Sequence, residues 1–146
     1  METQNSNVVT LPVPAQVETT DMKLARRWGG HELLFARPDG WVGVPVAFLR
    51  LYGSLKPYAL TVAEGMFVIE LMAFKWGDGA PFPSYATVAK RMGVSTKMVQ
   101  RYAAQLEGKG YLKRQARIGS SNAFNLQGLF DALAAAIEEE RKRAVA

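Results

Sequence analysis

The sequence of 146 residues has no cysteine and only one histidine, His31. Without cysteine there is no disulfide framework, no thiolate metal site and no cysteine nucleophile, and this fits an intracellular protein. Long hydrophobic runs are also missing, because the most apolar stretch, residues 66–74, is too short to span a bilayer. The chain does not begin with a basic region followed by an apolar run, so we expect no signal peptide.

The residue combinations that support enzyme chemistry are missing as well. Glu70 and Asp78 have no histidine or second carboxylate at a spacing that suits acid–base catalysis. Ser120 and Ser121 have no base near them in the sequence. The glycines lack the lysine that accompanies a phosphate-binding loop. We therefore expect no enzyme activity, no cofactor and no metal site, and we place His31 on the surface without a chemical role.

Acidic residues are scarce in one segment, residues 84–118. This segment has eight basic side chains and one acidic side chain, Glu107, so its net charge is +7. The whole chain carries +5, so the other residues sum to −2. Concentrated positive charge on a compact fold indicates a partner with a phosphate backbone. The eight basic residues are Lys90, Arg91, Lys97, Arg101, Lys109, Lys113, Arg114 and Arg117.

The N-terminal part of the chain shows weaker signals. Residues 1–20 are polar, with two prolines and no period, which predicts a disordered arm. In the lead-in segment, residues 21–56, we expect a short helix from Asp21, as a possible cap, to the glycines at 29–30. A hairpin follows, with strands at 33–36 and 41–44 around a Pro-Asp-Gly turn. The segment ends in a helix whose apolar stripe is Val46, Phe48, Leu49 and Leu51.

A capping box at Thr61 and Glu64 begins the next helix. The residues that follow are apolar on nearly all sides, which predicts a buried core helix. Gly-Asp-Gly at 77–79 ends it, and we expect Phe82, in the extended link that follows, to fill the core. Tryptophans are most often core anchors, and the same is expected of Trp28, Trp41 and Trp76.

Two short helices joined at Gly93 come next. Ser84 and Ser95 are good caps for them, and Gly93 suits a helix end that needs a positive φ. Apolar residues recur at helical spacing in both helices: Tyr85, Val88, Ala89 and Met92, then Val99, Tyr102, Ala103 and Leu106. The opposite face of the second helix has two cations, two polar side chains and no acid: Thr96, Lys97, Gln100, Arg101 and Ala104.

A basic hairpin and a last helix complete the chain. Residues 111–117 read as a strand, 119–122 as the tip and 123–126 as the returning strand, with Leu112 and Phe124 facing the core. Residues 128–146 predict a helix with an apolar stripe at Leu129, Phe130, Leu133 and Ile137. That helix either joins a second copy or packs back on its own domain.

The order helix, helix, basic hairpin resembles the winged helix-turn-helix family. Ala89, Gly93 and Val99 match the small residue, the turn glycine and the β-branched residue of the helix-turn-helix signature. The resemblance covers roughly residues 38–130, of which residues 57–127 would form the winged helix-turn-helix domain, and it implies a mainly α fold with a small β-hairpin wing. Residues 95–107 would be the recognition helix in the major groove, and residues 111–125 the wing on the backbone or minor groove. The amino-acid sequence is similar to those of the helix-turn-helix domains of plasmid and phage replication initiators and related regulators.

The resemblance implies a protein that binds double-stranded DNA by sequence, as a homodimer or as several copies on repeats. It would act in the cytoplasm, at a nucleoid or plasmid, in replication initiation or transcriptional repression. Gln100 and Arg101 suit adenine and guanine edges, and five cations suit phosphates. The candidate DNA-binding residues are Ser95, Thr96, Lys97, Gln100 and Arg101 on the helix, with Lys90, Arg91, Lys113, Arg114 and Arg117 on the phosphates.

Two alternatives stay open at this point. The same basic face could meet an acidic protein partner, as in an adaptor for partition or replication, and neither the repressor nor the initiator role is distinguished by the residues. RNA is less favoured, because Tyr102 and Tyr111 belong to core stripes and not to an exposed sheet face that stacks bases.

Overall fold

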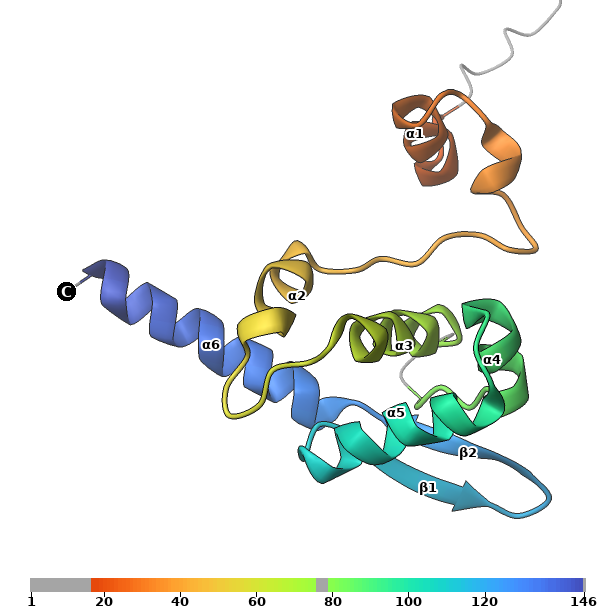
Figure 1. Ribbon diagram of the computed structural model, residues 1–146. Coiled ribbons are helices and arrows are strands. Elements are labelled where there is room, and N and C mark those ends of the chain that lie inside the picture. Colours follow the sequence, from red (N-terminus) through yellow and green to blue (C-terminus); the bar gives the residue numbers. More distant parts are fainter. Residues whose placement is uncertain (1–16, 76–78, 146) are drawn as a thin grey trace, which may run out of the picture. The chain divides into compact units, whose positions relative to one another are not determined.

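The computed structural model describes residues 17–75 and 79–145 (Figure 1). Within them the chain is mainly helical, with one two-stranded antiparallel hairpin, which confirms the predicted fold class. The chain divides into two compact units, one ending at Trp41 and the other running from Val42 to the C-terminus. No helix of the described residues is both long and apolar enough to cross a membrane.

The first unit begins with α1 (Thr20–Arg27). Its N-cap is Thr19, whose side-chain oxygen accepts a hydrogen bond from the amide of Met22 at 3.2 Å. The predicted cap, Asp21, instead accepts a bond of 2.7 Å from the indole N–H of Trp41. Gly29 follows the helix with a positive φ of 91°, as expected of a glycine that stops a helix.

The hairpin predicted within residues 33–44 is wrong. The chain forms a short 3₁₀ helix, η1 (Glu32–Leu34), and no strand there. The amides of Phe35 and Ala36 both bond to the carbonyl of Glu32, so the first segment satisfies its backbone locally. Because an isolated ribbon of two short strands is at best marginally stable, local hydrogen bonding prevails.

Two of the three tryptophans do not anchor a core. Trp28 is 68% exposed and Trp41 is 50% exposed, so that prediction is wrong for both. A unit of this size encloses too little volume to bury two indoles. Trp76 lies outside the described residues, and so do residues 1–16, which make up most of the predicted arm.

The second unit contains all the other elements. The hairpin and the four longest helices meet around one core, to which α3 contributes Phe67, whose ring lies against Tyr102 and Phe124 at centroid distances of 6.3 and 6.2 Å. The elements are α2 (Val46–Leu51), η2 (Tyr52–Ser54), α3 (Val62–Ala73), α4 (Tyr85–Met92), α5 (Thr96–Gly108), β1 (Lys113–Arg117), β2 (Ser120–Asn125) and α6 (Gln127–Val145).

The capping box of α3 is confirmed. The amide of Thr61 donates to the carboxylate of Glu64 at 2.8 Å, and the amide of Glu64 donates back to the threonine hydroxyl at 3.1 Å. On α2, half of the predicted apolar stripe is buried: Phe48 and Leu51 reach the core, while Val46 and Leu49 are exposed. A six-residue helix has room to bury only one narrow face.

The last helix packs tightly where it begins. The amide of Leu129 donates to the carbonyl of Tyr111 at 3.2 Å, and a Cβ at Gly128 would lie 2.2 Å from the carbonyl oxygen of Gly110. Leu129 and Leu133 are buried, so the first turns of α6 belong to the core of its own domain. Its C-terminal half runs past α2 and projects from the domain (Figure 1).

Candidate nucleic-acid interface

The two helices α4 and α5 join at a tight turn. Gly93 adopts the left-handed conformation, with φ 69° and ψ 32°, and the amide of Val94 bonds to the carbonyl of Ala89 at 3.1 Å. Ala89 and Val99 are buried on either side of this turn. The hydroxyl of Ser95 accepts a bond from the amide of Met98 at 3.1 Å and so begins α5 at the predicted residue. The local geometry of both helices therefore follows from capping and turn residues.

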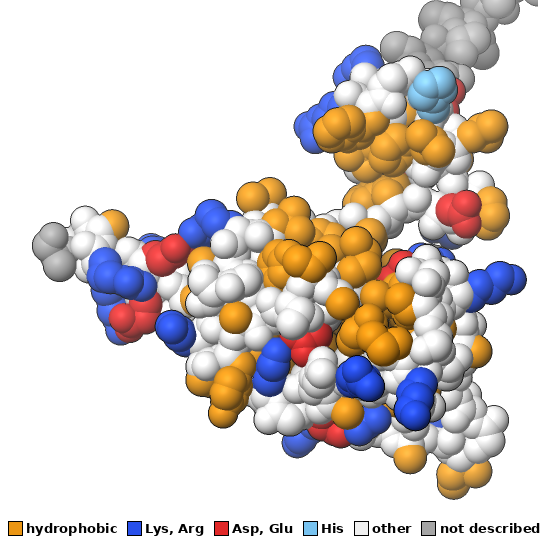
Figure 2. Space-filling model, in the orientation of Figure 1, with side chains coloured by type: hydrophobic (Ala, Val, Ile, Leu, Met, Phe, Trp, Pro, Cys, Tyr) orange, Lys and Arg blue, Asp and Glu red, His pale blue; other side chains and the backbone are white. Residues whose placement is uncertain are grey.

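The structure separates the two faces of α5 as the spacing predicts. Its inner face is buried in the core: Val99, Tyr102, Ala103 and Leu106. Its outer face is exposed along the whole helix: Thr96, Lys97, Gln100, Arg101 and Ala104. In Figure 2, lysine and arginine side chains gather over the lower part of the domain, where Figure 1 places α5 and the hairpin.

The hairpin that follows α5 is a basic ribbon with a short turn. Its antiparallel register pairs Lys113 with Asn125 and Arg117 with Ser120, with an irregularity between residues 115 and 117. The turn is at residues 118–119, so the predicted tip at 119–122 is wrong. Gly119, with φ 64°, allows this tighter turn. Ile118 is fully exposed in it.

Phe82 lies beside this ribbon and not in the core. Its ring is 51% exposed, and the guanidinium carbon of Arg117 lies 4.1 Å from its centroid. The prediction that Phe82 fills the core is therefore wrong. Phe124 is buried in the core, with its ring 5.8 Å from that of Tyr85. The stacked guanidinium keeps its charge, because an aromatic ring attracts a cation without neutralising it.

Arg114 is half-buried and is paired within the domain. Its guanidinium donates to the Glu107 carboxylate at 3.1 Å from Nε and to the Tyr85 hydroxyl at 3.1 Å from Nη1. The hydrogen bond to Glu107, and then the one to Tyr85, raise the pKa of Arg114, and the same bond from Arg114 lowers the pKa of Glu107. This cluster fastens the end of α5 to the first strand of the hairpin.

Arg91 is also paired within the domain. Its Nε donates to the Glu70 carboxylate at 2.7 Å, and its guanidinium carbon lies 4.8 Å from the centre of the Phe74 ring. Both partners belong to α3 or its C-cap. The neighbouring Lys90 is exposed at the end of α4. Thus only one of these two predicted phosphate contacts leaves its charge free.

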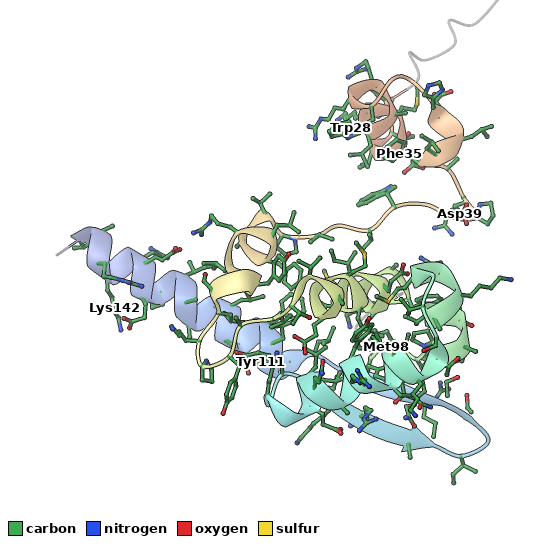
Figure 3. All side chains as sticks on the ribbon, in the orientation of Figure 1. Trp28, Phe35, Asp39, Met98, Tyr111 and Lys142 are labelled. Carbon is green, nitrogen blue, oxygen red and sulfur yellow. The ribbon has the colours of Figure 1, made fainter. Side chains whose placement is uncertain are left out.

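Lys109, at the end of α5, pairs with a carboxylate that is 1% exposed, that of Glu64. Its Nζ donates to Glu64 at 2.7 Å and to the carbonyl of Ala59 at 2.8 Å. Beside it, the hydroxyl of Tyr111 donates to the carbonyl of Tyr58 at 2.6 Å; Figure 3 labels Tyr111. These three hydrogen bonds tie the end of α5 and the residues just after it to the first turn of α3 and the segment that leads into it.

The structure thus divides the eight cations of the basic segment. Arg91, Lys109 and Arg114 each pair with a carboxylate. Within the described chain, five cations lie in no such pair: Lys90, Lys97, Arg101, Lys113 and Arg117. The bracing roles of Glu107, Tyr85 and Phe82 were missed from the sequence. One signal was present, because Glu107 is the only acid in the segment and a lone acid among cations is a natural ion-pair partner.

Comparison with protein families identifies this part of the chain. A family model described as a helix-turn-helix domain matches residues 58–112. Residues 58–112 form a helix-turn-helix domain. The helix-turn-helix domain gives the chain a DNA-binding role, and the hairpin directly after it makes the arrangement that of a winged helix. A search of curated proteins gave no match.

The match covers α3, α4 and α5 and ends just before β1. The helix-turn-helix domain therefore includes the bonds by which Glu64 and Lys109 fix the end of α5. In the part of the chain that the structure describes, no three His, Cys, Asp or Glu side chains gather so that they could hold a metal ion.

Proposed function

We propose that the chain binds double-stranded DNA by sequence, with α5 in the major groove and the hairpin β1–β2 on the backbone or in the minor groove. The observation that carries this proposal is the outer face of α5, which is exposed, has two cations and has no acid. A helix that reads a groove needs such a face, because phosphates attract cations, and base edges present acceptors and donors that polar side chains can bond to.

Base reading falls to the outer face of α5. Arg101 suits the two acceptors of a guanine edge, and Gln100 suits the donor and acceptor of an adenine edge. Thr96 and Lys97 lie one turn earlier, at the N-terminal end of α5. In helix-turn-helix domains, this end of the recognition helix contacts the base edges. Ala104 is small, and this allows the helix to approach the bases closely. Ser95 caps α5, and its hydroxyl proton is available to a phosphate.

Phosphate contacts fall to the cations that lie outside the domain's carboxylate pairs. These are Lys90, Lys113 and Arg117, with Lys97 at the edge of the base-reading set. Arg91 and Arg114 were candidates from the sequence, but each already lies against a carboxylate. A cation that is already paired with a carboxylate releases few counterions from DNA. We therefore assign these two arginines a structural role and do not include them among the phosphate contacts.

A single domain of this kind buries about 600–1,000 Å² on DNA, which is modest. We therefore propose that the chain acts as a homodimer or as several copies on repeated sites. Replication initiation or transcriptional repression of a plasmid or phage would use such an arrangement. Footprinting on DNA that flanks the gene separates the two: a single palindrome favours repression, and an array of direct repeats favours replication.

A salt titration tests the electrostatic part. With about four phosphates neutralised, the logarithm of affinity should fall against the logarithm of salt concentration with a slope of about −4. Fluorescence anisotropy of a labelled random-sequence 20-base-pair duplex measures this slope. A slope near zero would reject the proposed phosphate contacts.

Base reading is tested at Arg101. Once a preferred site has been selected from random duplexes, Arg101→Ala should weaken binding to it by about 1–3 kcal/mol and relax the choice of base. Lys56→Ala removes an exposed cation from a loop outside the interface and serves as the matched control. An equal loss on the selected site and on random DNA would show that Arg101 contacts only phosphate. If the protein ignores duplex DNA at low salt but retains an acidic protein, the interaction-module alternative replaces DNA binding.

A further inference from the structure

The projecting half of α6 has two different faces. One face turns toward α2: Arg50 donates two hydrogen bonds to the carboxylate of Glu140, at 2.7 and 3.0 Å. The outer face contains Ala134, Glu138, Arg141 and Val145, at successive spacings of four, three and four residues. All four are exposed, and Val145 is 88% exposed. Lys142 is labelled on this projecting end in Figure 3.

The outer face of one copy would match the outer face of a second copy that runs antiparallel to it. Around a point midway between residues 139 and 140, Glu138 exchanges with Arg141, and Ala134 exchanges with Val145. A twofold axis through this point would set each acid opposite a base and each end residue opposite another apolar residue. Within the described chain, neither Glu138 nor Arg141 lies in an ion pair.

We propose that the outer face of α6 is a docking surface for the same face of a second copy of this chain, with the two helices antiparallel. The 4-3-4 spacing is that of a coiled-coil seam, in which side chains of two helices meet along one line. Ala134 is small and lets the helices approach closely. Leu129 and Leu133, buried in the core, fix the direction in which the face points.

The charges at this seam set register more than strength. Two exposed ion pairs contribute roughly 0–1 kcal/mol each, and only three turns of helix meet, so association in free solution is weak. Polar side chains in a seam nevertheless select one register and orientation, because a shifted or parallel pairing sets like charges together. Two copies held side by side on DNA have a high effective concentration, which turns a weak contact into cooperative binding. This last step rests on the proposed function, whereas the helix pairing does not.

Disulfide trapping tests the pairing, because the chain has no cysteine of its own. Full-length Ala134→Cys and Val145→Cys proteins are mixed and oxidised without DNA. The antiparallel seam places residue 134 of one copy against residue 145 of the other, so mixed dimers should form faster than either self-dimer. Two copies of residue 134 would lie about 16 Å apart along the helix, beyond the reach of a disulfide. Ala86→Cys, exposed on α4, gives the rate of random collision.

Other outcomes would overturn the proposal. Faster self-dimers at residue 134 would mean a parallel or shifted pairing, and trapping no faster than that of Ala86→Cys would mean no pairing. Charge exchange then tests the ion pairs. With Glu138→Arg in both partners, like charges meet and mixed trapping should slow roughly tenfold or more. With Glu138→Arg in one partner and Arg141→Glu in the other, the charges again match and trapping should recover. If none of these charge changes alters the rate of disulfide trapping, the ion pairs of the seam are rejected.

A duplex titration separates this result from the proposed function. Each charge variant is titrated against a random-sequence 20-base-pair duplex at low salt. If the chain binds the duplex but trapping is absent, the helix pairing is rejected and DNA binding is kept. If trapping occurs but the chain does not bind the duplex, the proposed function is rejected and the pairing is kept.

Discussion

At the end of α5, the ammonium of Lys109 joins two segments that are far apart in the sequence. It bonds to Glu64 at 2.7 Å and to the carbonyl of Ala59 at 2.8 Å, while the same carboxylate oxygen accepts the amide of Thr61 at 2.8 Å. Glu64 is almost fully buried. A buried carboxylate that loses its cation is left as an uncompensated charge, which is far more costly than losing an exposed pair.

Lys109→Met should therefore lower the free energy of unfolding by about 3 kcal/mol, measured by urea denaturation. Adding Glu64→Gln should recover part of the loss, since a glutamine at this position can still complete a capping box. Lys113→Met removes an exposed lysine of β1 and should change stability by less than about 0.5 kcal/mol. If both single variants lose equally little, the buried pair does not stabilise the fold.

A second residue-scale prediction concerns Glu107 and Arg114. The hydrogen bond from Arg114 lowers the pKa of Glu107 from its ordinary value of 4.5. A lowered pKa means that the folded chain binds fewer protons, so this stabilisation is present above about pH 4.5 and is lost as the pH falls through the folded pKa. The Glu107 side chain is 38% exposed, which limits the effect.

Glu107→Gln should lower the thermal midpoint by about 2–4 °C at pH 7. The difference from the unaltered chain should shrink as the pH is lowered from 7 toward 3, because Glu107 takes up a proton as the pH falls through its lowered pKa. Circular dichroism melts over this range measure it. Glu139→Gln, on the exposed end of α6, is the control and should show no such trend. A difference that stays constant from pH 7 to pH 3 would contradict the ionic origin.

The residue scale also shows what the sequence could and could not predict. The exposed and buried faces of α5 were predictable, because helical spacing alone assigns them. The partners of the cations were not, since Glu70 lies 21 residues from Arg91 and Glu64 lies 45 residues from Lys109. Only the packing of α3 against α4 and α5 brings such residues together. Charge counting therefore overestimated the number of free cations.

At the scale of elements, the start of α6 depends on close backbone contact at Gly128. A Cβ there would lie 2.2 Å from the carbonyl oxygen of Gly110, which is far inside van der Waals contact. This contact lets Leu129 reach the core and donate to Tyr111 at 3.2 Å. Any side chain at residue 128 would push the whole helix outward, away from the end of α5.

Gly128→Ala should accordingly lower the free energy of unfolding by about 1–3 kcal/mol, as overpacking does. Gly108→Ala is the matched control: it lies in the last turn of α5, a Cβ there meets nothing within 4 Å, and alanine favours a helix over glycine by up to about 1 kcal/mol. Guanidinium denaturation of both variants compares them. Equal stability of the two would mean that α6 shifts without cost.

Elements differed in how well their signals predicted them. The helices α3, α4 and α5 each begin at a hydroxyl cap that the sequence identified, and a cap acts within one turn. The prediction of the N-terminal hairpin was wrong because pairing between two four-residue segments stabilises less than local hydrogen bonds do. The prediction of the hairpin after α5 was right because Phe124 enters a core already formed by other elements.

At the scale of the whole molecule, the second unit has a core of its own. Every buried residue of its hydrophobic cluster lies at or after Phe48, and the partly buried residues around that cluster begin at Val44. A chain that starts at Val42 should therefore keep its thermal midpoint within about 3 °C of the full chain, measured by calorimetry. A fall of more than about 10 °C would show that the first unit stabilises the second.

Whole-molecule properties were only partly predictable. Net charge is a sum over the sequence, so the basic segment was visible at once. The division at Trp41 was not predicted, because it depends on which contacts form and not on composition. The lead-in segment at 21–56 in fact spans that boundary.

The side chain of Ile118, at the turn of the hairpin, is fully exposed in the free domain. Its replacement should leave folding untouched, so selection for a stable fold cannot retain an isoleucine there. A library randomised at this codon and sorted first for expression, then for the activity of the protein, would expose the difference. If many residues at position 118 survive the sort for expression and few survive the sort for activity, then the activity of the protein, and not its folding, restricts this position.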